Sequence, residues 1–141
     1  MSTQVETANT NFVRSTTIPT VIVAFLALAM ADLIMRFGGF KRLHRTVRSW
    51  RVSEKKGNPV AAIHAVCTAV DRAATYYLRH ALCLQRSAVI TCLLRREGIS
   101  AEMVIGCRKI PFRGHAWVEV DGQVVSDTPK VQIHYRVLER C

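Results

Sequence analysis

The sequence predicts an α+β fold in which N-terminal helices pack on a small antiparallel sheet. Apolar residues recur at helical spacing up to about residue 97, and short strand-like segments with turn signals follow after Gly98. Half of the 141 residues are hydrophobic, which is enough for the core of one domain. We therefore expect one globular domain, with helices first and strands second.

The first expected helix is the apolar stretch 18–36, which follows a polar arm over residues 1–17 and is interrupted by Gly38 and Gly39. A helix that spans a membrane needs about 20 apolar residues. This stretch reaches that length only by including Asp32, which is unfavourable in hydrocarbon. We therefore favour a helix buried in the protein core over a membrane segment.

A basic amphipathic helix is expected next, because residues 36–56 contain eight basic residues and one acid, with Leu43, Val47 and Trp50 at helical spacing. The charges most simply form a solvated face, and the alternative is a docking surface for an acidic peptide or protein. The formal net charge of +10 favours an acidic partner. Charge alone does not distinguish nucleic acid, an anionic membrane and an acidic peptide.

Two further helices have clear starts or stops. Asn58 can cap a helix whose first residue is Pro59, and that helix is predicted to run to about Arg79. After a break at residues 80–82, a third helix is predicted from about Cys83 to residue 97, with Gly98 as its C-cap residue.

Strand patterns occupy the rest of the chain. Residues 99–107, 116–120 and 123–126 read as strands of an antiparallel meander. Asp121 and Gly122 form a hairpin signal between the last two strands.

The cysteines do not form a recognisable structural motif. There are five, an odd number, and no CxxC pair is present, so neither a disulfide framework nor a structural zinc site is expected. We therefore expect free thiols in a reducing cytoplasm, with no metal and no cofactor. The cysteines are Cys67, Cys83, Cys92, Cys107 and Cys141.

Cys83 is the candidate nucleophile because it begins a helix, where backbone N–H groups and the helix dipole favour a thiolate. The same N–H groups could stabilise an oxyanion. A nucleophile of this kind needs a base and a group that orients the base, and His115 and Asp127 suit these roles. Taken singly, His115 could be structural and Asp127 an ordinary turn acid. Together with Cys83 they follow the chain order of a known class of nucleophilic enzymes.

The hairpin register decides whether His115 and Asp127 can meet. A two-residue turn pairs Val120 with Gln123 and places the two side chains on opposite faces of the sheet. A three-residue loop pairs Glu119 with Gln123 and puts His115 directly opposite Asp127. We therefore predict the three-residue loop with a bulge.

Two sequence blocks stand out within residues 83–129, CLQRS at the start of the third helix and HAWVEVDG at the hairpin. This segment resembles the leader peptidases of lasso-peptide biosynthesis, which belong to the transglutaminase-like cysteine protease superfamily. The blocks CLQRS and HAWVEVDG carry the resemblance, whereas Gln85 and Cys107 depart from the family pattern. The resemblance implies a transglutaminase-like, papain-like core over residues 58–141. It also implies that Cys83 attacks a peptide carbonyl, His115 relays the proton and Asp127 orients His115.

The resemblance further implies a precursor peptide as substrate, a separate leader-recognition protein and a cyclase resembling asparagine synthetase. Residues 1–57 show no strand-rich recognition domain, so we expect them to contact the recognition protein instead. We expect no nucleic-acid partner, disfavour membrane contact and expect a cytoplasmic location. Two alternatives remain: an acyltransferase that uses the same three residues, and a non-catalytic basic adaptor that binds membrane or nucleic acid through residues 36–56.

Overall fold

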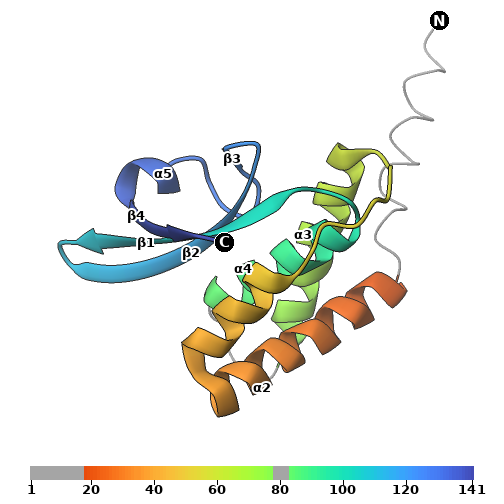
Figure 1. Cartoon of the computed structure of the whole chain (residues 1–141), viewed down its shortest axis with the longest axis horizontal. Helices are drawn as coiled ribbons and strands as arrows, with labels where there is room; N and C mark the ends of the chain where they lie inside the picture. Colours follow the sequence, from red (N-terminus) through yellow and green to blue (C-terminus); the bar gives the residue numbers. More distant parts are fainter. Residues whose placement is uncertain (1–17, 78–82) are drawn as a thin grey trace, which may run out of the picture.

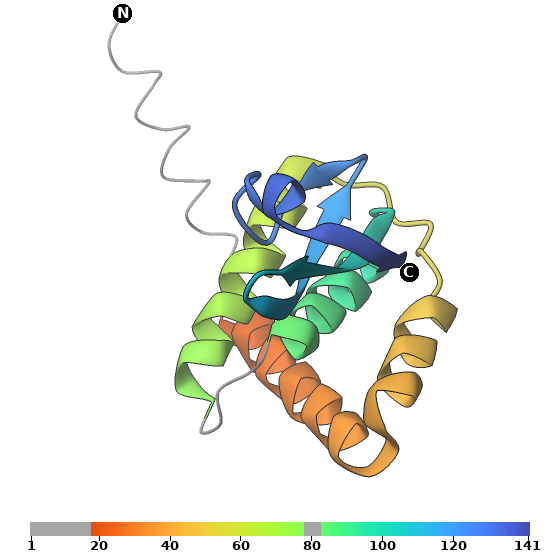
Figure 2. The same ribbon diagram turned by 90° about the vertical axis from the view of Figure 1, so that its left-hand side faces the viewer.

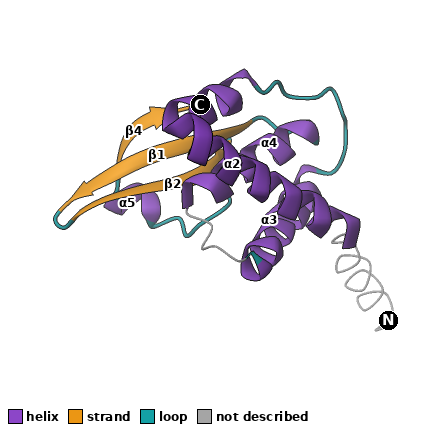
Figure 3. Ribbon diagram, turned by 90° about the horizontal axis from the view of Figure 1, so that it is seen from below, coloured by secondary structure: helices purple, strands orange, loops and turns teal. Residues whose placement is uncertain are grey.

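The computed structural model describes residues 18–77 and 83–141. Its helices α2 (Ile18–Ser49), α3 (Pro59–Tyr76) and α4 (Cys83–Arg96) lie on one side of an antiparallel sheet of four strands (Figures 1 and 3). The predicted α+β class is confirmed. The arm expected over residues 1–17 and the break expected at residues 80–82 lie outside the described residues.

The sheet has the order β3-β2-β1-β4. A short helix, α5, connects β3 to β4 and lies on the face of the sheet opposite the three long helices (Figure 1). The bounds are β1 (Ala101–Lys109), β2 (Phe112–Val120), β3 (Gln123–Val124), α5 (Val131–His134) and β4 (Arg136–Arg140).

Helix α2 contains both the apolar and the basic stretch of the sequence, and it bends at Gly39, where φ is 68° (Figure 2). Gly39 therefore kinks the helix, because a positive φ costs glycine little. One face of the first half enters the core through Ala24, Leu28 and Ala31, but the opposite face is exposed, so the expected core helix is buried only in part. By length and composition, Thr20–Ser49 could cross a membrane.

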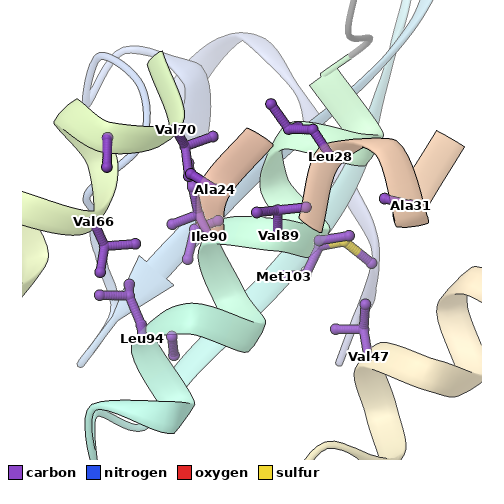
Figure 4. Close-up of a cluster of buried hydrophobic side chains, with 14 of the residues drawn as sticks. Ala24, Leu28, Ala31, Val47, Val66, Val70, Val89, Ile90, Leu94 and Met103 are labelled. Atoms are coloured by element: carbon purple, nitrogen blue, oxygen red, sulfur yellow. The ribbon is translucent and has the colours of Figure 1, made fainter. Parts of the chain in front are cut away.

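The main core lies where α2, α3 and α4 meet and where α4 covers β1 and β2 (Figure 4). Leu43 and Val47 of the basic half of α2 are buried in it, beside residues from the other helices. Side chains from both sides of residue 57 thus pack in one core. The predicted division into an N-terminal segment, residues 1–57, and a catalytic core, residues 58–141, stays a prediction. Trp50, which continues the same spacing, is 45% exposed.

The start of α3 and the end of α4 that the sequence indicated are confirmed by their caps, whereas α3 ends at Tyr76, before the predicted end near Arg79. The Asn58 carboxamide oxygen accepts the N–H groups of Val60 and Ala61 at 3.1 and 3.3 Å, at the start of α3. At the end of α4, Gly98 has a φ of 84° and donates to the Arg95 carbonyl. These bonds satisfy backbone groups that a helix end leaves without partners.

The strands differ from the prediction in their bounds and in the elements that follow β3. β1 spans Ala101–Lys109 instead of residues 99–107, and β3 spans only Gln123–Val124 instead of residues 123–126. β2 begins at Phe112 and not at residue 116, where the sequence predicted the strand to start, so residues 112–115 extend the hairpin with β1. The C-terminal elements α5 and β4 were not predicted at all. All five residues of β4 are exposed, so the strand has no buried face and therefore no alternating apolar pattern.

Candidate functional site

The three residues that the sequence singled out lie around one cleft of about 50 Å³, between the beginning of α4 and one edge of β2. The helix contributes residues that share one face, because they are spaced by three and four positions. The strand and the segment after β3 form the opposite wall. The lining residues are Cys83, Arg86, Ser87, Ile90, His115, Ala116, Ser126 and Asp127.

The hairpin between β2 and β3 contradicts the predicted register. Val120 pairs with Gln123, so the turn has two residues, Asp121 and Gly122, with φ values of 51° and 76°. Two successive positive φ values are typical of a type I′ turn, which matches the twist of a hairpin. The three-residue loop with a bulge, which we predicted from the sequence, is therefore wrong.

Asp127 nevertheless reaches His115, because the chain leaves the sheet before that residue. The Val125 N–H still donates to the Val118 carbonyl at 2.9 Å. The Val118 N–H, however, donates to the Ser126 hydroxyl oxygen at 2.8 Å instead of to the Val125 carbonyl. Alternation between faces holds only within a ladder, and Asp127 lies beyond its end.

The imidazole of His115 and the carboxylate of Asp127 form a short hydrogen bond, with 2.6 Å between Nε2 and Oδ2. Burial raises the pKa of Asp127, but the hydrogen bonds from His115 and the Thr128 N–H, with the nearby Arg86 cation, hold that pKa below its ordinary value. Asp127 is therefore ionised at neutral pH. Because Nε2 faces the carboxylate, Nδ1 is the ring nitrogen left to exchange a proton with a thiol.

Three of the thiols outside the cleft, those of Cys67, Cys92 and Cys141, have the properties of structural groups. Burial raises the pKa of Cys67 and of Cys92 to about 11, and it also raises the pKa of Cys141. A thiol with such a pKa is protonated at neutral pH and is a poor nucleophile. Cys67 donates its S–H to the Val125 carbonyl at 3.5 Å, which helps to hold the segment that leads to Asp127.

Aromatic rings surround His115 on the face of the sheet that α5 covers. The ring centroids of Tyr135 and Trp117 lie 5.2 and 6.1 Å from the imidazole. Trp117 is fully buried, and Gly106 of β1 leaves room for it, because a Cβ at Gly106 would lie 2.8 Å from the indole ring. These rings restrict the orientations that the imidazole can adopt.

A buried carboxylate, Glu119, anchors this aromatic group. It is 1% exposed and accepts hydrogen bonds from Trp117 at 2.8 Å, Gln132 at 2.9 Å and Arg140 at 2.6 Å. Burial raises the pKa of Glu119, but the hydrogen bonds from Arg140, Gln132 and Trp117 hold it below its ordinary value. The network ties the site to the C-terminal segment.

The sequence analysis did not predict the aromatic rings beside His115 or the hydrogen bonds of Glu119. The alternation of β2 could have placed Trp117 and Glu119 on the same face as His115, since they follow it at intervals of two residues. Tyr135 and Arg140 gave no local signal. Among the described residues, His, Cys, Asp and Glu side chains form no group of three suited to a metal ion.

Comparison with known proteins identifies related sequences. Residues 27–140 match the family described as the transglutaminase-like superfamily. A stretch of 50 residues is 44% identical to the microcin J25-processing protein McjB of Escherichia coli. The matched stretch is 36% of the present chain and 24% of the length of McjB. No solved structure matches the chain.

Proposed function

Because the chain belongs to the transglutaminase-like superfamily, we propose that it is a cysteine peptidase that removes the leader peptide from a lasso-peptide precursor. The observation that carries the proposal is one cleft lined by Cys83, His115 and Asp127, in which the imidazole and the carboxylate are hydrogen bonded. The likeness to a microcin J25-processing protein supports a ribosomally made peptide as the substrate.

In the proposed mechanism, His115 Nδ1 takes the proton of Cys83, and the thiolate attacks the scissile carbonyl carbon. The carbon–sulfur bond forms as the carbonyl π electrons move to oxygen. N–H groups in the first turn of α4, which have no acceptor within the helix, would stabilise that oxyanion. Asp127 stays ionised and holds the imidazolium in place.

Collapse of this intermediate breaks the peptide bond, and the leaving amine takes its proton from His115. The leader remains attached to Cys83 as a thioester. His115 then removes a proton from a water molecule, whose oxygen attacks the thioester carbonyl. The carbon–sulfur bond then breaks, and His115 returns its proton to the departing thiolate. The products are the core peptide with a free amine, a leader with a free carboxylate and the regenerated Cys83 thiol.

A separate leader-recognition protein is the proposed partner, and α2 offers the surface for it. Five apolar side chains recur on its exposed side at intervals of three and four residues, so they form a stripe along the helix. A contiguous exposed apolar surface is typical of an interaction site. The stripe consists of Ile22, Leu26, Met30, Leu33 and Phe37, which are between 49% and 78% exposed.

Two further features of α2 support docking of a protein. An apolar pocket of about 250 Å³ lies between the two halves of the kinked helix and α4, with Met30 and Trp50 in its lining. Exposed Arg42, Arg45 and Arg48 follow the kink and suit an acidic partner or leader. Reversal of these three charges should weaken partner or leader binding, and unchanged binding would count against this surface.

The proposed function also implies a later reaction and a cellular location. A cyclase resembling asparagine synthetase would close the ring on the released core peptide. We also propose a cytoplasmic location, which would suit five free cysteines, since a reducing compartment preserves thiols.

Mass spectrometry of a candidate precursor tests the function directly. The chain would be incubated with the precursor, with and without the recognition protein, beside the variants Cys83→Ala and Cys107→Ala. We expect separate leader and core masses with the native chain and Cys107→Ala, and none with Cys83→Ala. Processing by Cys83→Ala would refute the peptidase. Transfer of the leader to an added amine would instead identify the acyltransferase.

A further inference from the structure

A second, open groove of about 350 Å³ begins at the cleft and continues towards α5. His115 and Asp127 line both hollows, so a peptide with its scissile bond at Cys83 could continue into this groove. Its other walls include Arg108 of β1 and Tyr135, together with Lys130, which immediately precedes α5. The groove would therefore contact peptide residues close to the scissile bond.

The groove carries positive charge that the protein does not neutralise. Among the described residues, neither Arg108 nor Lys130 forms an ion pair. The one acid that lines the groove, Asp127, is directed at His115. Two cations without acidic partners beside a peptide path favour an anionic group on the peptide.

Two further features of Arg108 favour the binding of an anion. Its Nε atom is buried and has no hydrogen-bond partner in the described structure. Arg113 of β2 lies directly opposite it in the register of the hairpin, and like charges in that position repel each other. A bound carboxylate would satisfy the guanidinium and would offset the repulsion.

We infer that this groove is a subsite for an acidic side chain, Asp or Glu, of the peptide substrate, within a few residues of the scissile bond. Arg108 offers the planar donor pair that fits a carboxylate, and Lys130 adds a second charge. The inference rests on the proposed function, because it assumes that a peptide lies across Cys83.

Affinity labels test the subsite without knowledge of the natural precursor. The probes are bromoacetyl-(glycine)ₙ-glutamate amides with zero to three glycines, each paired with its glutamine counterpart. The Cys83 thiolate displaces bromide, so that a carbon–sulfur bond forms, and peptide mass mapping confirms the labelled cysteine. At one spacing we expect the glutamate probe to label Cys83 about fivefold faster than the glutamine probe.

Substitutions connect that preference to the groove. Arg108→Gln and Lys130→Gln should each reduce the glutamate preference, and the double variant should abolish it. Lys109→Gln removes the same charge from the residue next to Arg108, outside the groove lining, and should leave the preference intact. Glutathione, a free thiol in solution, gives the intrinsic ratio of the rates at which the glutamate and glutamine probes react. The same ratio for Cys83 at every spacing would overturn the subsite, and so would a glutamate preference that survives in the double variant.

The same reagents separate this inference from the proposed catalysis. Any accessible thiol reacts with a bromoacetyl group, so the comparison of the two probes remains informative even if Cys83 is not a catalytic nucleophile. The catalytic role is tested by uncharged bromoacetamide, whose reaction with Cys83 should slow in His115→Ala. If the glutamate preference is absent but His115→Ala slows the bromoacetamide reaction, the subsite has failed and the proposed catalysis has not. If the preference is present but His115→Ala reacts at the native rate, the catalytic role has failed instead.

Discussion

Replacement of Glu119 by Gln should destabilise the protein and should do so mainly near neutral pH. The carboxylate accepts from Trp117 and Gln132 at one oxygen and from Arg140 at the other. A carboxamide has only one oxygen. If that oxygen faces Trp117, the NH₂ group of the carboxamide faces the Arg140 guanidinium. Two hydrogen-bond donors then face each other, and no hydrogen bond forms between them.

The structure sets the size of the effect. Breaking a fully buried ion pair typically costs about 3–5 kcal/mol. The Arg140 side chain is 44% exposed, however, so water can solvate it after the substitution. The loss is then closer to one charge-assisted hydrogen bond, about 2 kcal/mol. For a chain of this length, that loss lowers Tm by roughly 4–8 °C.

The pH dependence follows from the direction of the pKa shift. Burial opposes ionisation of Glu119, but its hydrogen bonds outweigh burial and hold its pKa in the folded protein below the ordinary value. The carboxylate therefore stabilises the fold above the unfolded pKa of about 4.3, and this contribution is lost as the pH falls through the folded pKa. The difference between native protein and Glu119→Gln should shrink in acid.

Urea denaturation followed by circular dichroism at neutral and acidic pH measures this difference. Glu102→Gln is the matched control, because Glu102 pairs with the same arginine at 3.5 Å but has an exposed side chain. We expect the control to change the free energy of unfolding by less than about 1 kcal/mol. Equal stability of Glu119→Gln and native protein at neutral pH would refute the reasoning, as would a difference that persists in acid.

Three further predictions concern the site and its support. Asp127→Asn should reduce precursor cleavage by at least about tenfold, because the imidazolium loses its carboxylate partner; a native rate would show that the 2.6 Å bond has no catalytic role. Gly106→Ala should cost about 1–3 kcal/mol in urea unfolding, because its Cβ would meet the indole ring, whereas Gly114→Ala enters open space; equal losses would contradict the close packing. Iodoacetamide at neutral pH should label Cys83 before Cys67, whose pKa of about 11 keeps it protonated, and mass mapping of the reverse order would contradict the assignment of the nucleophile.

Membership of the transglutaminase-like superfamily, which the sequence blocks CLQRS and HAWVEVDG implied, is confirmed by the match over residues 27–140. The roles of Cys83, His115 and Asp127 in catalysis stay predictions. The structure shows that the three residues line one cleft, and that two of them are hydrogen bonded. The reason given from the sequence for their proximity was wrong, since the hairpin does not have the register that we predicted.

Local patterns were sufficient for features that depend on neighbouring residues. The Asn58–Pro59 helix start, the Gly98 helix end and the hairpin signal at Asp121 depend on backbone conformations that a few adjacent residues control. Helical spacing likewise predicted that Leu43 and Val47 share a buried face. Such features can be read from the sequence alone.

Tertiary structure decided the features that join distant segments. Asp127 meets His115 because Ser126 replaces a backbone partner of Val118 and ends the ladder, and no periodic pattern signals that exchange. Tyr135 reaches the imidazole through an exposed C-terminal segment whose pairing with β1 creates the contact. The physical reason is that these contacts form between segments far apart in the chain, so their stability depends on how those segments pack. Caps and turns are instead stabilised by interactions between adjacent residues.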